Sequence, residues 1–128
     1  MDNFTLEATS RTPAISLDAS AGTLLIAGES YPEDVRTFFH VLSENVATFV
    51  GSNPNSLDVA IKLTYFNSSS ARMLMELLDQ FDDAAGNGVT VNVNWYCDPD
   101  DDITREFAED IASEVKDAVV KILDLDAE

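Results

Sequence analysis

The residues best placed to do chemistry are the hydroxyls of segment 65–70, which reads Tyr-Phe-Asn-Ser-Ser-Ser. The segment lies where a predicted strand ends and a predicted helix begins, so its backbone N–H groups lack intrahelical partners and the helix dipole is positive there. A phosphate on Ser68 would be received by those amides, and its charge would change how a partner docks at this edge. A plainer use exists, because Asn67 and Ser68 are also favoured helix N-caps. Spacing alone leaves both interpretations open.

Aromatic and polar neighbours are expected around Ser68. Trp95 falls on the apolar side of its strand and is predicted to lie in the core. Tyr96 ends that strand, and parallel pairing would bring it near Ser68, where an aromatic side chain can anchor a partner. The residues predicted to surround the phosphoacceptor or to bind a partner are Tyr31, Asn67, Ser69, Ser70, Arg72 and Tyr96.

A second candidate is the acidic run that precedes the last predicted helix. Four acids fall at positions one, three, five and twelve of a calcium-loop template, namely Asp98, Asp100, Asp102 and Glu109. The sixth position requires glycine but is Ile103, which also begins an apolar helical stripe, so Asp101 or Asp102 is better explained as a helix cap. We predict no specific metal site. A small metal-dependent enzyme that uses Asp98–Asp102 is the alternative from another functional class.

The chain offers little for nucleophilic or cofactor chemistry. It has one histidine, His40, which lies off the apolar stripe of its helix, and one cysteine, Cys97, which is expected to pack in the interior. No Ser-His-Asp or Cys-His arrangement can be built without this single histidine. No glycine-rich phosphate loop is present and nothing calls for a cofactor. We therefore expect a binding protein and not an enzyme.

The charge balance limits the partners. The chain of 128 residues has 24 Asp and Glu against 7 Lys and Arg, a formal net charge of −17. Such a surface repels nucleic acid and anionic lipid. No apolar run reaches the roughly 20 residues that cross a bilayer, and no secretory signal is evident. We expect one cytoplasmic domain, residues 1–128.

Hydropathy periodicity predicts the element order ββαβαβα. Segments 12–17 and 23–27 form strands around a turn, and Ser30 caps a helix that Gly51 ends. Alternation predicts strands over 57–66, with Tyr65 on the apolar side, and over 89–96. A helix starting at 67–68 separates them. A last helix after Asp102 turns these residues inward: Ile103, Phe107, Ile111, Val115, Val119 and Ile122.

These elements predict an α/β fold with a four-stranded mixed sheet. Helical crossovers imply parallel strands. Because the strands alternate instead of being apolar throughout, the helices are expected mainly on one face, which leaves the other face open to a partner.

Three motifs carry a resemblance to known proteins. The strand–Ser–helix segment 57–74 resembles that of STAS-domain anti-sigma-factor antagonists, which are phosphorylated on a serine. More closely, segments 12–15, 28–33 and 65–70 resemble, in the same order, motifs of the SiaC family of bacterial regulatory phosphoproteins. The similarity spans about residues 12–96 and implies a STAS-like fold.

The SiaC resemblance implies a switched regulator. In that family the unphosphorylated protein binds and activates a diguanylate cyclase, a dedicated Ser/Thr kinase phosphorylates it, and a PP2C-type phosphatase reverses the reaction. The family's acceptor is a threonine, and Ser68 stands at that position here. A constitutive scaffold, in which Ser68 is only a cap, is the remaining alternative.

Overall fold

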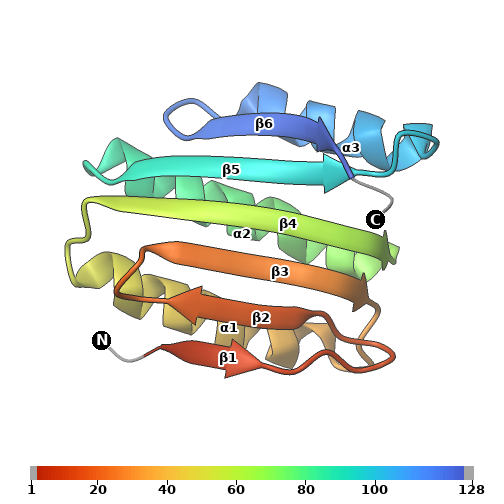
Figure 1. Ribbon diagram of the computed structural model, residues 1–128, viewed down its shortest axis with the longest axis horizontal. Helices are drawn as coiled ribbons and strands as arrows, with labels where there is room; N and C mark the ends of the chain where they lie inside the picture. Colours follow the sequence, from red (N-terminus) through yellow and green to blue (C-terminus); the bar gives the residue numbers. More distant parts are fainter. Residues whose placement is uncertain (1–2, 126–128) are drawn as a thin grey trace.

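The computed structural model describes residues 3–125, which form one mixed sheet and three helices. The strands are β1 (Phe4–Leu6), β2 (Ala14–Asp18), β3 (Thr23–Ser30), β4 (Ser56–Phe66), β5 (Thr90–Cys97) and β6 (Val119–Asp124). The helices are α1 (Val35–Gly51), α2 (Ser68–Gly86) and α3 (Asp102–Glu114). The strands lie in the sheet in sequence order, antiparallel from β1 to β3 and parallel from β3 to β6 (Figure 1).

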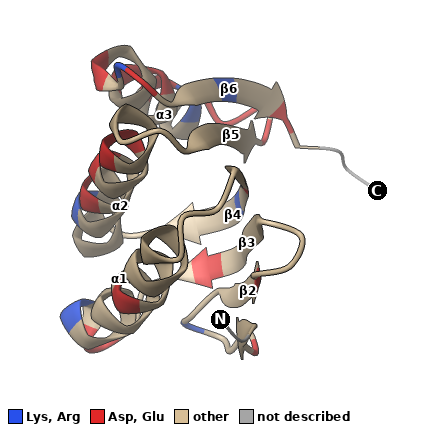
Figure 2. Ribbon diagram, turned by 90° about the vertical axis from the view of Figure 1, so that its left-hand side faces the viewer, with Lys and Arg blue, Asp and Glu red and all other residues tan. Residues whose placement is uncertain are grey.

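The three helices cover the same face of the sheet (Figure 2). Each helix connects two parallel neighbours, and such crossovers are almost always right-handed. Because all three crossovers step in the same direction along the sheet, their helices must lie on one side. The one-sided arrangement predicted from the half-polar strands is therefore confirmed. Within residues 3–125, no helix has both the length and the apolar composition needed to span a bilayer.

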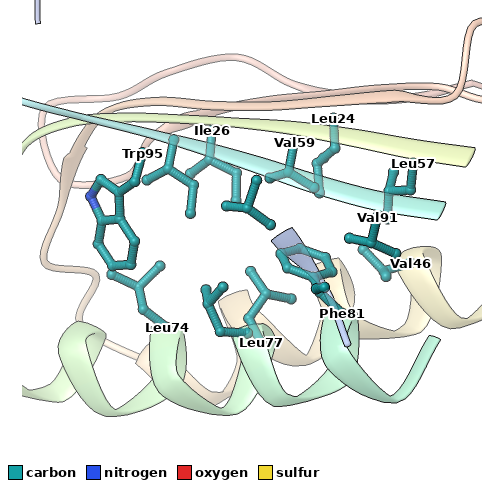
Figure 3. Close-up of a cluster of buried hydrophobic side chains, with 14 of the residues drawn as sticks. Leu24, Ile26, Val46, Leu57, Val59, Leu74, Leu77, Phe81, Val91 and Trp95 are labelled. Carbon is teal, nitrogen blue, oxygen red and sulfur yellow. The ribbon is translucent and has the colours of Figure 1, made fainter. Parts of the chain in front are cut away.

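The core lies between the sheet and the helices. Alternate side chains of each central strand point inward, as in β4, where Leu57, Val59 and Ile61 are all buried. They meet Leu74, Leu77 and Phe81 of α2 (Figure 3). At the end of this cluster the Trp95 side chain is fully buried, as predicted.

The sheet has six strands, so the predicted four-stranded sheet is wrong at both edges. At one edge β1 pairs with β2, with Phe4 opposite Leu17 and Leu6 opposite Ile15. Three residues are too few to show an alternating pattern, so β1 gave no signal in the sequence.

At the other edge, the last predicted helix is shorter than expected. Helix α3 ends at Glu114, Val115 is extended, and residues 119–124 form β6 against β5. The apolar spacing through Val119 and Ile122 suits a helix, but the run is rich in β-branched residues and β5 would otherwise expose its hydrogen-bonding edge. Ile103, also predicted to point inward, is 83% exposed.

A bulge changes the end of β4. Gly28 of β3 pairs with Leu63 and Glu29 pairs with Tyr65, so Thr64 is skipped. The extra residue inverts the alternation beyond it. Tyr65, predicted on the apolar side, is therefore 51% exposed, while Phe66 packs against Phe107 at 5.5 Å between ring centroids. Gly28 has φ of 120°, which a residue with a side chain rarely adopts.

Helix α1 begins four residues later than predicted. Ser30 ends β3, paired with Phe66, and does not cap the helix. The cap is Asp34, which accepts hydrogen bonds from Thr37 Oγ1 at 2.7 Å and from Thr37 N at 3.2 Å. Residues 31–34 are needed to carry the chain from the sheet to the helical layer, which is why the earlier serine could not serve as the cap.

Asp82 of α2 fixes the turn between α3 and β6. Its carboxylate accepts hydrogen bonds from the backbone N–H groups of residues 116, 117 and 118, the shortest being 2.7 Å from Asp117. The amides of Ala118, Asp117 and Lys116 lower the pKa of the Asp82 carboxyl below its ordinary value. The edge strand β6 is thus held to the helical layer by one side chain.

Replacing Asp82 with alanine is expected to lower the free energy of unfolding by about 2 kcal/mol, because three amides lose a charged acceptor. The folded-state pKa of this carboxyl lies below the unfolded one, so its contribution is present above about pH 4 and is lost as pH falls through the folded pKa. Urea unfolding between pH 3 and pH 7 measures both effects. Asp82→Asn keeps an acceptor oxygen and should therefore lose less stability than Asp82→Ala. Its stability should not show the pH dependence that the Asp82 carboxyl gives the wild type. Equal stability of wild type and Asp82→Ala would contradict the assignment.

Candidate functional site

Ser68 is the first residue of α2, and the cap of this helix is its neighbour. Asn67 is extended, with φ of −88° and ψ of 177°, and its Oδ1 accepts the N–H of Ser70 at 2.9 Å. Within residues 3–125, the Ser68 hydroxyl has no hydrogen-bond partner, and its side chain is exposed. Of the two caps that the sequence allowed, the structure selects Asn67, so the Ser68 hydroxyl has no capping role.

The cap assignment predicts different costs for the two neighbours. Asn67→Ala is expected to lower the free energy of unfolding by about 1 kcal/mol, because the Ser70 amide loses its acceptor. Ser68→Ala should change it by less than about 0.5 kcal/mol, since that side chain forms no hydrogen bond with the part of the chain that the structure describes. Urea titration followed by Trp95 fluorescence measures both variants. A larger loss for Ser68→Ala than for Asn67→Ala would mean that the cap is misassigned.

Ser70 anchors the helix to the sheet and is inaccessible. Ser70 Oγ and Ser30 Oγ share a hydrogen bond of 2.8 Å, and both residues are fully buried. The Asn67 N–H also donates to the Ser30 carbonyl oxygen at 3.2 Å. These bonds join the ends of β3 and β4 to the first turn of α2. They hold Ser68 in a defined position while Ser70 itself is shielded from any modifying enzyme.

A hollow of about 460 Å³ lies beside Ser68, between the first turns of α1 and α2. Ser68, Ser69 and Arg72 line it from α2, and Arg36 lines it from α1. Arg36 was not among the predicted site residues. Its position on an exposed helix face carries no signal until the packing of α1 beside α2 is known.

The two predicted tyrosines do not line this hollow. Tyr31 packs edge to face against Tyr65, with 5.7 Å between ring centroids, and does not line the hollow. The Tyr96 ring lies 5.0 Å from Lys62 Nζ, and both residues belong to the open-face positions of their strands. The structure therefore gathers Asn67, Ser69, Ser70 and Arg72 at Ser68 but separates Tyr96 from it by the sheet.

The acidic run before α3 serves to begin the helix. Asp101 Oδ2 accepts from Thr104 Oγ1 at 2.7 Å and Oδ1 accepts from the Thr104 N–H at 3.0 Å, so Asp101 is the N-cap. The Thr104 hydroxyl and amide lower the pKa of the Asp101 carboxyl. In residues 3–125, no three potential metal-ligating side chains gather at one place.

The histidine and the cysteine have ordinary surroundings. His40 is exposed on α1, with Nε2 3.0 Å from Glu44 Oε1. Cys97 is fully buried, and burial raises the pKa of its thiol, which disfavours the reactive thiolate. Both placements agree with the sequence prediction.

Comparison with known proteins decides the family. Residues 6–125 match the family model described as SiaC family regulatory phosphoprotein. The chain belongs to the SiaC family. It is also 32% identical over 110 residues to an uncharacterised protein of Pseudomonas aeruginosa, a match that covers 86% of this chain and 87% of the relative.

Solved structures of SiaC support the same placement. Apo-SiaC from Pseudomonas aeruginosa superposes with a TM-score of 0.88 at 29% identity, covering 96% of this chain and 99% of that one. A second structure contains the diguanylate cyclase SiaD of the same organism in complex with its activator SiaC. It matches with a TM-score of 0.84 at 28% identity, over 93% of this chain and 98% of that chain. The six-stranded sheet and three helices described above are thus the SiaC fold.

Proposed function

We propose that this SiaC family protein is a phosphorylation-switched activator of a diguanylate cyclase, and that it acts by binding and not by catalysis. The observation that carries the proposal is the match, over nearly the whole chain, to a SiaC solved as the activator of a diguanylate cyclase. The unphosphorylated protein would engage the cyclase and raise its synthesis of cyclic di-GMP.

Ser68 is the proposed switch residue. Its exposed hydroxyl takes no part in capping, so a kinase can reach it and modify it without removing a structural bond. A kinase would transfer the γ-phosphoryl group of ATP to Ser68 Oγ, which loses its proton, and a PP2C-type phosphatase would hydrolyse the ester. Each modification adds about two negative charges at the first turn of α2.

The rigid surroundings of Ser68 give the added charge a fixed position. Asn67 and the Ser30–Ser70 bond hold the first turn in place, so the phosphate appears at a constant position on the surface. A partner that docks over this turn then meets new bulk and a new charge together. No movement elsewhere in the fold is required for the switch.

Reconstitution tests the proposal. Each diguanylate cyclase of the source organism is assayed for cyclic di-GMP formation with the unphosphorylated protein, and again with the protein phosphorylated on Ser68. We expect one cyclase to be activated by the first form alone. SiaC with SiaD from Pseudomonas aeruginosa serves as the positive control. If no cyclase responds while that control works, the proposed activity is wrong; if both forms activate equally, the switch is wrong.

A further inference from the structure

The hollow beside Ser68 concentrates positive charge in a chain that has little of it. Arg36 and Arg72 are two of only 7 Lys and Arg residues, against 24 Asp and Glu. Both line the same hollow as Ser68. A random distribution of the seven Lys and Arg residues over the chain would seldom place two of them beside the proposed phosphoacceptor.

These two arginines are also the ones left uncommitted. Among residues 3–125, Arg11 forms an ion pair with Glu33 and Arg105 forms one with Asp124, whereas Arg36 and Arg72 form none. Because the guanidinium group cannot lose its proton at physiological pH, the hollow presents two permanent positive charges.

The helices hold the two arginines at opposite walls of the hollow. Arg72 follows Ser68 by four residues on α2, which places both on one face of that helix. Arg36 is the second residue of α1. Farther along, Gln80 Nε2 donates to the Ser43 carbonyl oxygen at 2.9 Å, and Ser43 Oγ donates to Gln80 Oε1 at 2.8 Å. This pair of bonds fixes the spacing of α1 and α2.

We propose that a phosphate on Ser68 is held within the chain by Arg36 and Arg72, so that it bridges α1 and α2. The inference rests on Ser68 being the phosphoacceptor, as proposed above. Arginine binds phosphate through two parallel hydrogen bonds, and two arginines match the charge of the dianion. Once they bind the phosphate, the two arginines can no longer form ion pairs with carboxylates of a partner protein. Glu76 also lines the hollow and weakens the bridge by repulsion.

Phosphorylated protein, with phosphoserine incorporated at position 68, tests the bridge without any cyclase. In low salt we expect phosphorylation to raise the Tm of the wild type by about 3 °C and to have no such effect in the double variant Arg36→Gln/Arg72→Gln. The rise should disappear in 1 M NaCl, where the screening length is only about 3 Å. By phosphorus NMR, the second pKa of the phosphate should be lower in the wild type than in the double variant.

Two single variants serve as controls. Lys116→Gln removes a positive charge from the turn between α3 and β6, which Asp82 holds near the C-terminal end of α2, and should leave the Tm rise and the phosphate pKa unchanged. Glu76→Gln removes the repelling carboxylate and should enlarge the Tm rise. Equal phosphate pKa and equal Tm rise in the wild type and the double variant would overturn the bridge. Such a result would leave the cyclase switch intact, whereas failure of cyclase activation would leave these measurements unaffected.

Discussion

Cyclase activation by Ser68→Asp is expected to be at least about tenfold weaker than activation by Ser68→Ala, measured as the protein concentration that gives half-maximal cyclic di-GMP synthesis. Aspartate brings one of the phosphate's two charges to the first turn of α2, at a position that the Asn67 cap holds fixed. Alanine removes only a hydroxyl that makes no hydrogen bond to any other residue in the range 3–125. The comparison therefore isolates charge from the loss of the serine.

Three controls sharpen this result. Ser113→Asp adds the same charge on the exposed side of α3 and should activate like the wild type, because the effect depends on position and not on net charge. Ser68→Thr keeps a hydroxyl at this position and should both activate the cyclase and accept phosphate. Ser68→Asp should be at least as stable to urea as Ser68→Ala, because an acidic residue in the first turn of a helix is favoured by the helix dipole, so weaker activation by Ser68→Asp would not reflect unfolding. Equal activation by those two variants would remove Ser68 from the switch.

How far the sequence could predict the fold is clearest at α2 and β5. Their apolar spacing is regular over many residues, and the buried positions Leu74, Leu77, Leu78 and Phe81 follow directly from it. The start of α2 was also predictable, since Asn67 and the serines are cap formers at the point where β4 ends. Local chemistry and tertiary packing agree in this region, so the pattern and the structure coincide.

Residues 115–124 show where pattern alone fails. Phe107, Ile111, Val115 and Val119 keep a helical spacing, yet the helix stops after Glu114. The deciding interactions are distant in sequence: Asp82 binds the amides of the turn, and β5 offers an unpaired edge to residues 119–124. The exposure of Tyr65 has a similar origin, because the bulge depends on how Gly28 pairs across two strands.

The candidate site was predictable on one helix and hidden on the other. Ser68, Ser69 and Arg72 lie within one turn of each other along the sequence, so helical geometry groups them. Arg36 joins them only because α1 packs beside α2, and Tyr96 leaves them because its side chain points to the opposite face from α2. Parallel pairing brings strand ends together but does not determine on which face of the sheet a side chain lies. Tyr96 lies on the open face, and the sheet therefore separates it from Ser68.

Phe81→Ala is expected to lower the free energy of unfolding by about 3–5 kcal/mol, the largest stability effect among these predictions. Phe81 is fully buried in the C-terminal half of α2, where it meets side chains of the central strands (Figure 3). All helices lie on one face, so this single apolar layer provides most of the burial that holds the sheet to them. The sheet has one apolar layer against its helices, so no other core compensates for the stability lost to a cavity under α2. The free energy of unfolding of a whole domain is typically about 5–15 kcal/mol, so this loss would be a large part of it.

Urea unfolding followed by the fluorescence of Trp95 measures this loss, because the only tryptophan of the chain is buried in the same core. Met75→Ala on the same helix is the matched control: that side chain is 42% exposed, and its removal should cost less than about 1 kcal/mol. Both variants keep the first turn of α2, so a folded Phe81→Ala protein at low temperature should still accept phosphate on Ser68. Similar losses for Phe81→Ala and Met75→Ala would mean that α2 does not seat its apolar face on the sheet as described.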